Sequence, residues 1–192
     1  MNASVFLSRI YKKQKPIDYF IYLSVIAMGI IIDQLTKFLV TYFMDLRQSV
    51  PLIKGFLHIT YIANDGAAFG SMDGEIGRIV FMTVSTVMIV AMALYLFLGH
   101  AESRLYGISV AMIISGGIGN MIDRLGFGFY VNPETGIGEV IDFIDFRGIW
   151  AYIFNGADSF VCIGAGLLIL ALVLDIIKEH KAEKEKKNEN QR

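Results

Sequence analysis

Two aspartates in this sequence each follow an asparagine by three residues, namely Asp123 after Asn120 and Asp158 after Asn155. Residues three apart lie on one face of a helix, so each pair would place an amide one turn from a carboxylate. If the two faces met, repulsion between the carboxylates would keep one of them protonated near neutral pH. The ionised carboxylate could then take a proton from water as the water attacks a carbonyl, while its protonated partner supports the oxyanion, as in an aspartic protease.

The elements that must position these residues are long apolar segments. Of the 192 residues, 55% are hydrophobic and only 18% are charged. A helix needs about 20 mostly apolar residues to cross a bilayer core of about 30 Å. Four segments meet this requirement: residues 17–44, 78–98, 105–122 and 154–177. The sequence therefore predicts an all-α polytopic membrane protein with four transmembrane helices.

The segments between and after these spans complete the predicted architecture. Only a few residues join the second span to the third, which predicts an antiparallel helical hairpin. Two segments of the long loops, residues 56–63 and 139–146, are rich in β-branched and aromatic residues, and we expect a small extracytoplasmic β-rich region from them. Residues 1–178 are expected to form a single membrane domain. Residues 179–192 are expected to be a charged cytoplasmic tail that frays from a helix end into disorder.

Positive charge predicts the orientation in the membrane. Most of the 17 Lys and Arg residues lie in the N-terminal segment, in the short turn between the second and third spans, and in the tail. Lys and Arg are retained on the cytoplasmic side, so we expect both termini in the cytoplasm and both long loops outside. At a rise of about 1.5 Å per residue, Asp33, Asp123 and Asp158 then lie near one level, at the outer membrane boundary.

Asp33 and Lys37 are charged residues within the first span. They are four residues apart and therefore share a helix face. Ionisable residues inside a span are costly and mark a functional site by default. We predict that Lys37 is compensated first by Asp33 and next by the carboxylates at the outer boundary.

Other interpretations of these residues stay open at this stage. Asp158 could cap the fourth helix, and Asp123 could form an ordinary ion pair with Arg124. Lys37 could be the base of a Ser-Lys mechanism, although Asp33 one turn away favours its charged form. A small proton- or cation-coupled transporter could use the polar residues as a relay, but the inner halves of the spans are almost wholly apolar. A non-catalytic membrane scaffold would leave the buried carboxylates without a role.

Composition excludes several other classes of protein. The 17 Lys and Arg residues nearly balance the 18 Asp and Glu residues, so there is no broad basic surface for a nucleic acid backbone. The single cysteine, Cys162, cannot form an internal disulfide, and no Cys/His cluster is present for zinc or iron. The three histidines have no HExxH spacing, which argues against a zinc protease.

Five blocks of the sequence, in order, resemble those of the lipoprotein signal peptidase (signal peptidase II) family of bacterial membrane aspartic endopeptidases. The blocks are DQLTK (33–37), NDGAAFG (64–70), GGIGNMIDR (116–124), VIDFIDF (140–146) and FNGADS (154–159). The resemblance implies a peptidase of the bacterial cytoplasmic (inner) membrane, with cytoplasmic termini and an active site near the outer face. One departure is residues 125–139, which are longer than the corresponding segment of compact family members.

The resemblance also implies roles for individual residues and for partners. Asp123 and Asp158 would be the catalytic pair. The residues that would brace the site or bind the substrate are Asp33, Lys37, Asn64, Gly66, Asn120, Arg124 and Asn155. The implied reaction removes the signal peptide from a diacylglyceryl-modified prolipoprotein by cleavage on the N-terminal side of the lipidated cysteine. Membrane lipid is the other expected partner; no metal, organic cofactor or nucleic acid is implied, and we expect a monomer.

Overall fold

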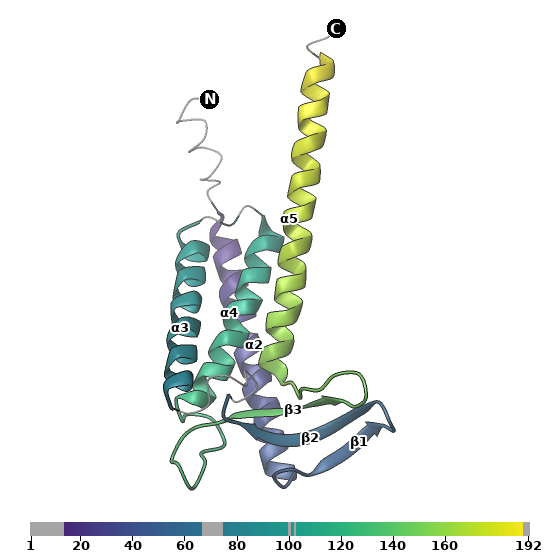
Figure 1. Cartoon of the computed structure of the whole chain (residues 1–192). Helices are drawn as coiled ribbons and strands as arrows, with labels where there is room; N and C mark the ends of the chain where they lie inside the picture. The colour runs from purple at the N-terminus through teal and green to yellow at the C-terminus, as the bar shows by residue number, and fades with distance from the viewer. Residues whose placement is uncertain (1–13, 67–74, 100, 102, 190–192) are drawn as a thin grey trace.

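In the computed structural model, the described residues form four long helices and a small sheet (Figure 1). The structure describes residues 14–66, 75–99, 101 and 103–189. The helices are α2 (Pro16–Phe43), α3 (Glu75–Phe97), α4 (Arg104–Arg124) and α5 (Gly156–Glu189). Each of them contains a segment that is long and apolar enough to cross a membrane. The prediction of four helices of membrane-spanning length is therefore confirmed.

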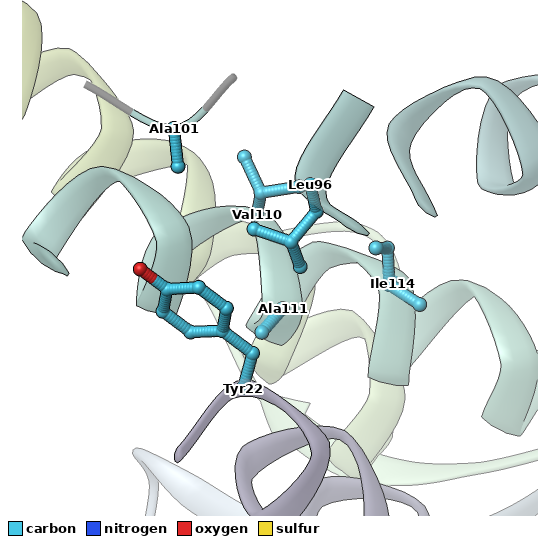
Figure 2. Close-up of a cluster of buried hydrophobic side chains, with 6 residues drawn as sticks. All are labelled: Tyr22, Leu96, Ala101, Val110, Ala111 and Ile114. Atoms are coloured by element: carbon cyan, nitrogen blue, oxygen red, sulfur yellow. The ribbon is translucent and has the colours of Figure 1, made fainter. Parts of the chain in front are cut away.

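The helix α4 packs against all three of the other helices. Glycines make this close packing possible: a Cβ at Gly116 would lie 2.3 Å from the carbonyl oxygen of Ala157 in α5, and one at Gly107 would lie 2.2 Å from the Tyr22 ring in α2. Small residues at such crossings let helix backbones approach each other. At the end of the bundle away from the sheet, a buried apolar cluster joins α2, α3 and α4 (Figure 2). Its members are Tyr22, Leu96, Ala101, Val110, Ala111 and Ile114.

The sheet has three antiparallel strands in the order β1-β2-β3. They are β1 (Ser49–Ile53), β2 (Leu57–Asn64) and β3 (Val140–Phe146). Figure 1 shows the sheet at the end of the bundle where α2 ends and α5 begins. An apolar face of the sheet attaches it to α2, because Tyr61, Ile141 and Phe143 form a buried cluster with Val40. The two predicted strand segments are confirmed, whereas β1 was not predicted.

The helix α5 extends further than the sequence predicted. The charged tail is helical as far as Glu189, where disorder had been expected. Lys and Glu both have high helix propensity, so their alternation does not interrupt the helix that enters the tail. Directly before the tail, Lys178 Nζ lies 3.1 Å from Asp175 Oδ1. The location of the tail in the cytoplasm and of the sheet outside it stays a prediction from the distribution of Lys and Arg.

Some of the sequence features lie outside the described residues. They are Arg9, Lys12 and Lys13 of the basic N-terminal segment, residues 67–70 of the NDGAAFG block, and His100.

Candidate active site

The ammonium group of Lys37 is completely buried and has three polar partners. Its Nζ lies 2.8 Å from Asp33 Oδ2 and 2.7 Å from Asp123 Oδ2. It also donates a hydrogen bond of 2.9 Å to Asn120 Oδ1. A lysine ammonium has three N–H donors, so these partners match its full capacity. The predicted partners of Lys37 are confirmed, and this ion cluster ties α2 to α4.

Asp33 extends the cluster from α2 to the start of α5. Its side chain is fully buried. Its Oδ1 accepts a hydrogen bond of 2.7 Å from the backbone N–H of Ala157, and its Oδ2 accepts one of 3.2 Å from Gln34 Nε2. Gly119 of α4 faces this carboxylate, since a Cβ there would lie 2.6 Å from Oδ2. Asp33 therefore holds three helices in a fixed relation.

Both carboxylate oxygens of Asp123 are covered by other groups. Oδ2 contacts Lys37, and Oδ1 accepts a hydrogen bond of 3.2 Å from Gln34 Nε2. Gly128 closes over the carboxylate, because a Cβ at this position would lie 2.3 Å from Oδ1. The side chain of Asp123 has no exposed surface. Asp123 is thus a neutralised and fully enclosed member of the ion cluster.

Arg124 does not supply the charge that compensates Asp123, as one interpretation of the sequence had proposed. Its guanidinium lies over the ring of Phe81, 4.5 Å from the ring centroid, which is a cation-π geometry. Its Nη1 donates a long hydrogen bond of 3.5 Å to the carbonyl oxygen of Asn120. Arg78 in turn donates to the carbonyl oxygen of Arg124. Arg124 therefore lies at the edge of the site and links α3 and α4 at the sheet end of the bundle.

Asp158 lies in the first turn of α5 and takes part in the cap of this helix. Its Oδ2 accepts a hydrogen bond of 3.1 Å from the backbone N–H of Asn155, and Asn155 Oδ1 accepts one of 2.9 Å from the backbone N–H of Asp158. This reciprocal arrangement is a capping box in which Asn155 is the N-cap and Asp158 is the N3 residue, so Asp158 takes part in the cap but is not itself the N-cap. Its Oδ1 accepts a further hydrogen bond of 2.8 Å from Asn120 Nδ2. These donors and the helix dipole favour the ionised form of Asp158.

A second carboxylate, Asp142 of β3, is held by the same asparagine that caps α5. Asn155 Nδ2 donates to Asp142 Oδ1 at 2.7 Å, and Asn64 Nδ2 donates to Asp142 Oδ2 at 2.8 Å. The side chain of Asp142 is 4% exposed. Burial raises the pKa of Asp142 to about 7; the hydrogen bond from Asn64 opposes this rise, and the charge of Asp158 adds to it. Asp142 and Asp158 are therefore two interacting carboxylates joined through Asn155.

Asn120 connects the ion cluster with this carboxylate pair. Its Oδ1 accepts hydrogen bonds of 2.9 Å from Lys37 Nζ and of 2.9 Å from Asn155 Nδ2, while its Nδ2 donates to Asp158. Asn64, the other donor to Asp142, is itself held by Gly66. The backbone N–H of Gly66 donates a hydrogen bond of 2.8 Å to Asn64 Oδ1, and the Gly66 φ of +100° is one that glycine adopts without strain. This bond leaves the Asn64 amide nitrogen directed at Asp142.

Sequence reasoning missed two residues of this arrangement, Asp142 and Gln34. Gln34 lies between two residues that were identified, and its amide bridges Asp33, the carbonyl oxygen of Gly119, and Asp123. Asp142 lies between Ile141 and Phe143, which are both buried. Burial of an acidic side chain costs free energy. An aspartate between two apolar residues of a predicted strand is therefore a sequence feature that indicates a functional site. The sequence analysis instead predicted Asp123 of α4, from its spacing relative to Asn120.

Comparisons with known proteins relate the chain to a peptidase family and to a membrane enzyme of known structure. The sequence model of a family described as signal peptidase (SPase) II matches residues 25–174. The chain is 39% identical over 155 residues to a lipoprotein signal peptidase of Fusobacterium nucleatum, covering 80% of this chain and 86% of that protein. It is 40% identical over 148 residues to a lipoprotein signal peptidase of Halothermothrix orenii, covering 77% of this chain and 92% of that protein. A solved structure of a bacterial membrane enzyme superposes with a TM-score of 0.67 at 32% identity, covering 81% of this chain and 88% of that one.

Replacement of Lys37 tests the ion cluster. Lys37→Met leaves Asp33 and Asp123 buried without a cation, and we expect unfolding free energy to fall by about 3–5 kcal/mol. Lys37→Arg should recover only part of the loss, because the planar guanidinium does not reproduce the three ammonium contacts. The measurement is denaturant unfolding in detergent. The matched control is Arg104→Met, which removes a cation that lies 2.8 Å from Asp18 but is 56% exposed, and it should change stability little. Equal stability of Lys37→Met and the parent would contradict the bracing role.

Proposed function

The chain belongs to the signal peptidase II family, and from that premise we propose that it removes signal peptides from prolipoproteins by aspartic catalysis, with Asp142 and Asp158 as the reacting pair. One observation supports this pair above others: Asn155 donates hydrogen bonds to both carboxylates, through its side chain to Asp142 and through its backbone to Asp158. An aspartic mechanism needs two carboxylates in one site with different proton affinities. The pKa of about 7 at Asp142 meets this need.

Asp123 was the expected partner of Asp158, and the geometry favours Asp142 over it. A reacting carboxylate must exchange protons with water and with the peptide. The charge of Asp123 is compensated by Lys37 at 2.7 Å, and Gly128 encloses its other oxygen. Asp142 contacts neutral amides only, among the hydrogen bonds of the described residues. We therefore assign Asp123 to the brace and Asp142 to the chemistry.

The proposed reaction uses one proton shared by the pair. Asp158, ionised at the start of α5, takes a proton from a water molecule whose oxygen attacks the carbonyl carbon of the scissile bond. Asp142 gives its proton to the carbonyl oxygen, which produces a neutral tetrahedral diol. The diol then collapses: one hydroxyl proton returns to Asp142, the proton on Asp158 goes to the leaving nitrogen, and the C–N bond breaks. The products are a carboxylic acid and an amine, and both carboxylates return to their initial states.

We further propose that the substrate is recognised by its lipid. Asp142 and Asp158 lie at the sheet end of the bundle, where α4 ends and α5 begins, and the predicted orientation puts this end at the outer face of the bacterial inner membrane. A peptide bond can reach the pair only at this depth. A diacylglyceryl group provides two acyl chains, which anchor a cysteine stably at the membrane boundary, whereas one chain gives only marginal binding. The scissile bond on the N-terminal side of that cysteine is then held at the level of the pair.

Substitution of the carboxylates tests the assignment. Asp142→Asn and Asp158→Asn should each lower cleavage by about 10³-fold or more while the protein stays folded, and the double variant should be little worse than either. Asp123→Asn should instead lower thermal stability, because it removes part of the counter-charge of Lys37. The matched control is Asp145→Asn, in the same strand as Asp142 but bonded to Thr60 and Arg147; it should retain cleavage. Substantial cleavage by Asp142→Asn, with none by a stably folded Asp123→Asn, would restore Asp123 to the pair.

The pH dependence of cleavage should report the proton on Asp142. This proton is present below a pKa of about 7 and is lost above it, so kcat/KM should fall as the pH rises through that value. The hydrogen bond from Asn64 stabilises the ionised form and lowers the pKa. Asn64→Ala should therefore raise the pKa and move the alkaline limb of the profile to higher pH. Thr60→Val, which removes a bond of 2.7 Å to Asp145 in the same sheet, should leave the limb in place. A limb that does not respond to Asn64→Ala would argue against Asp142 as its origin.

Substrate selection can be tested with matched precursors. A purified prolipoprotein that carries the diacylglyceryl cysteine should be cut, and the same precursor without the lipid, or with serine in place of the cysteine, should not. The readout is the mobility shift of each precursor on a gel after incubation with the enzyme in detergent or lipid. Equal processing of all three would show that the lipid is not recognised. No processing of any of them by a folded enzyme would contradict the proposed function itself.

A further inference from the structure

The segment of residues 125–139 forms an ordered lobe between α4 and β3, at the sheet end of the bundle (Figure 1). Its outer part is a hairpin in which Val131 pairs with Gly138. The N–H of Asn132 donates to the carbonyl oxygen of Ile137 at 2.8 Å, and Gly136 turns the chain with a φ of +68°. The lobe therefore has a defined conformation.

One face of the lobe is fixed to the protein. A Cβ at Gly128 would lie 2.3 Å from Asp123 Oδ1, and one at Gly138 would lie 2.1 Å from the backbone oxygen of Asp123. The ring of Tyr130 contacts the ring of Tyr61 in β2, with centroids 6.5 Å apart. These contacts make the lobe the cover over Asp123 and the ion cluster.

The lobe also carries four exposed apolar side chains, which we call its apolar face. These side chains come from alternate residues between the end of α4 and the hairpin. They are Leu125, Phe127, Phe129 and Val131. The exposed fraction of Phe127 is 79%, the largest among the exposed apolar side chains of the described residues. An exposed apolar patch of contiguous residues marks an interaction surface.

This apolar face continues the lipid-facing surface of the spans. Leu125 directly follows Arg124, the last residue of the span in α4. The ring of Phe129 lies 5.5 Å from the ring of Phe38 in α2, and Phe38 lies 5.7 Å from Tyr42. Phe38 and Tyr42 are exposed residues of the span Pro16–Phe43. Aromatic side chains are enriched at the boundary between the bilayer and water.

We propose that the apolar face of the lobe inserts into the interfacial layer of the phospholipid bilayer and anchors the cover over Asp123 at the membrane surface. The insertion rests on apolar contact rather than on charge, because residues 125–139 contain no Lys or Arg. Uncharged phospholipid therefore suffices as the partner. This inference concerns the attachment of the lobe and does not depend on the proposed catalytic pair.

Tryptophan fluorescence of the full chain in lipid nanodiscs tests the insertion. The chain has one tryptophan, so Trp150→Phe provides a silent parent into which Phe127→Trp is introduced. In discs of phosphatidylcholine brominated near the top of its acyl chains, emission from this variant should be quenched severalfold, and aqueous iodide should quench it weakly. The matched control is Thr135→Trp at the turn of the same lobe, where the order of the two quenchers should be reversed. Val131→Trp, on the same face as Phe127, provides a second variant if Phe127→Trp does not fold.

Three results would overturn the proposal. The first is a Phe127→Trp signal, or a Val131→Trp signal, that iodide quenches as strongly as the signal of Thr135→Trp. The second is protection from iodide without quenching by brominated lipid, which would mean that protein and not lipid covers the face. The third is quenching by brominated lipid only when anionic phosphatidylglycerol is added to the discs, which would mean that attachment depends on charge.

Discussion

The buried charge of Lys37 is the constraint on which the rest of the structure depends. An ammonium group without exposed surface must be compensated in place, and Asp33, Asp123 and Asn120 provide this compensation within 2.9 Å. These partners lie on α2 and α4, and Asp33 also accepts a hydrogen bond from the first turn of α5. One cation thereby fixes the relative positions of three helices, and the glycines at their crossings leave the space that this close approach requires.

The aspartates near this cation have the same side chain but different surroundings. Asp33 and Asp123 face a lysine at contact distance and act as fixed counter-charges. Asp158 faces amide donors and the start of a helix, which favour its negative charge. Asp142 is buried against amide groups and near the charge of Asp158, and its pKa rises to about 7. The surroundings therefore distinguish the two carboxylates that pair with Lys37 from Asp142, whose pKa lies near neutral pH.

The sequence predicted those parts of the site that depend on local spacing. The four spans follow from continuous apolar segments, and the contact of Asp33 with Lys37 follows from their separation by one helical turn. The position of Asp142 depends on pairing between segments that are distant in the sequence. β3 pairs with β2, and Ile144 of β3 pairs with Phe154, which lies just before α5. β1 is short, contains Pro51 and is largely exposed, so its residues carry little strand signal.

The start of α5 is where local and long-range constraints meet. The capping box sets the position of Asp158 relative to the backbone of Asn155. The backbone of Phe154 pairs with Ile144, so the residue before this cap is held beside the strand that carries Asp142. The N–H of Ala157, directly before Asp158, is held by Asp33 within the ion cluster. Residues 154–158 thus take part in the helix cap, in the strand pairing and in the ion cluster. A shift of the cap, of the strand or of the ion cluster therefore changes the separation of the two proposed reacting carboxylates.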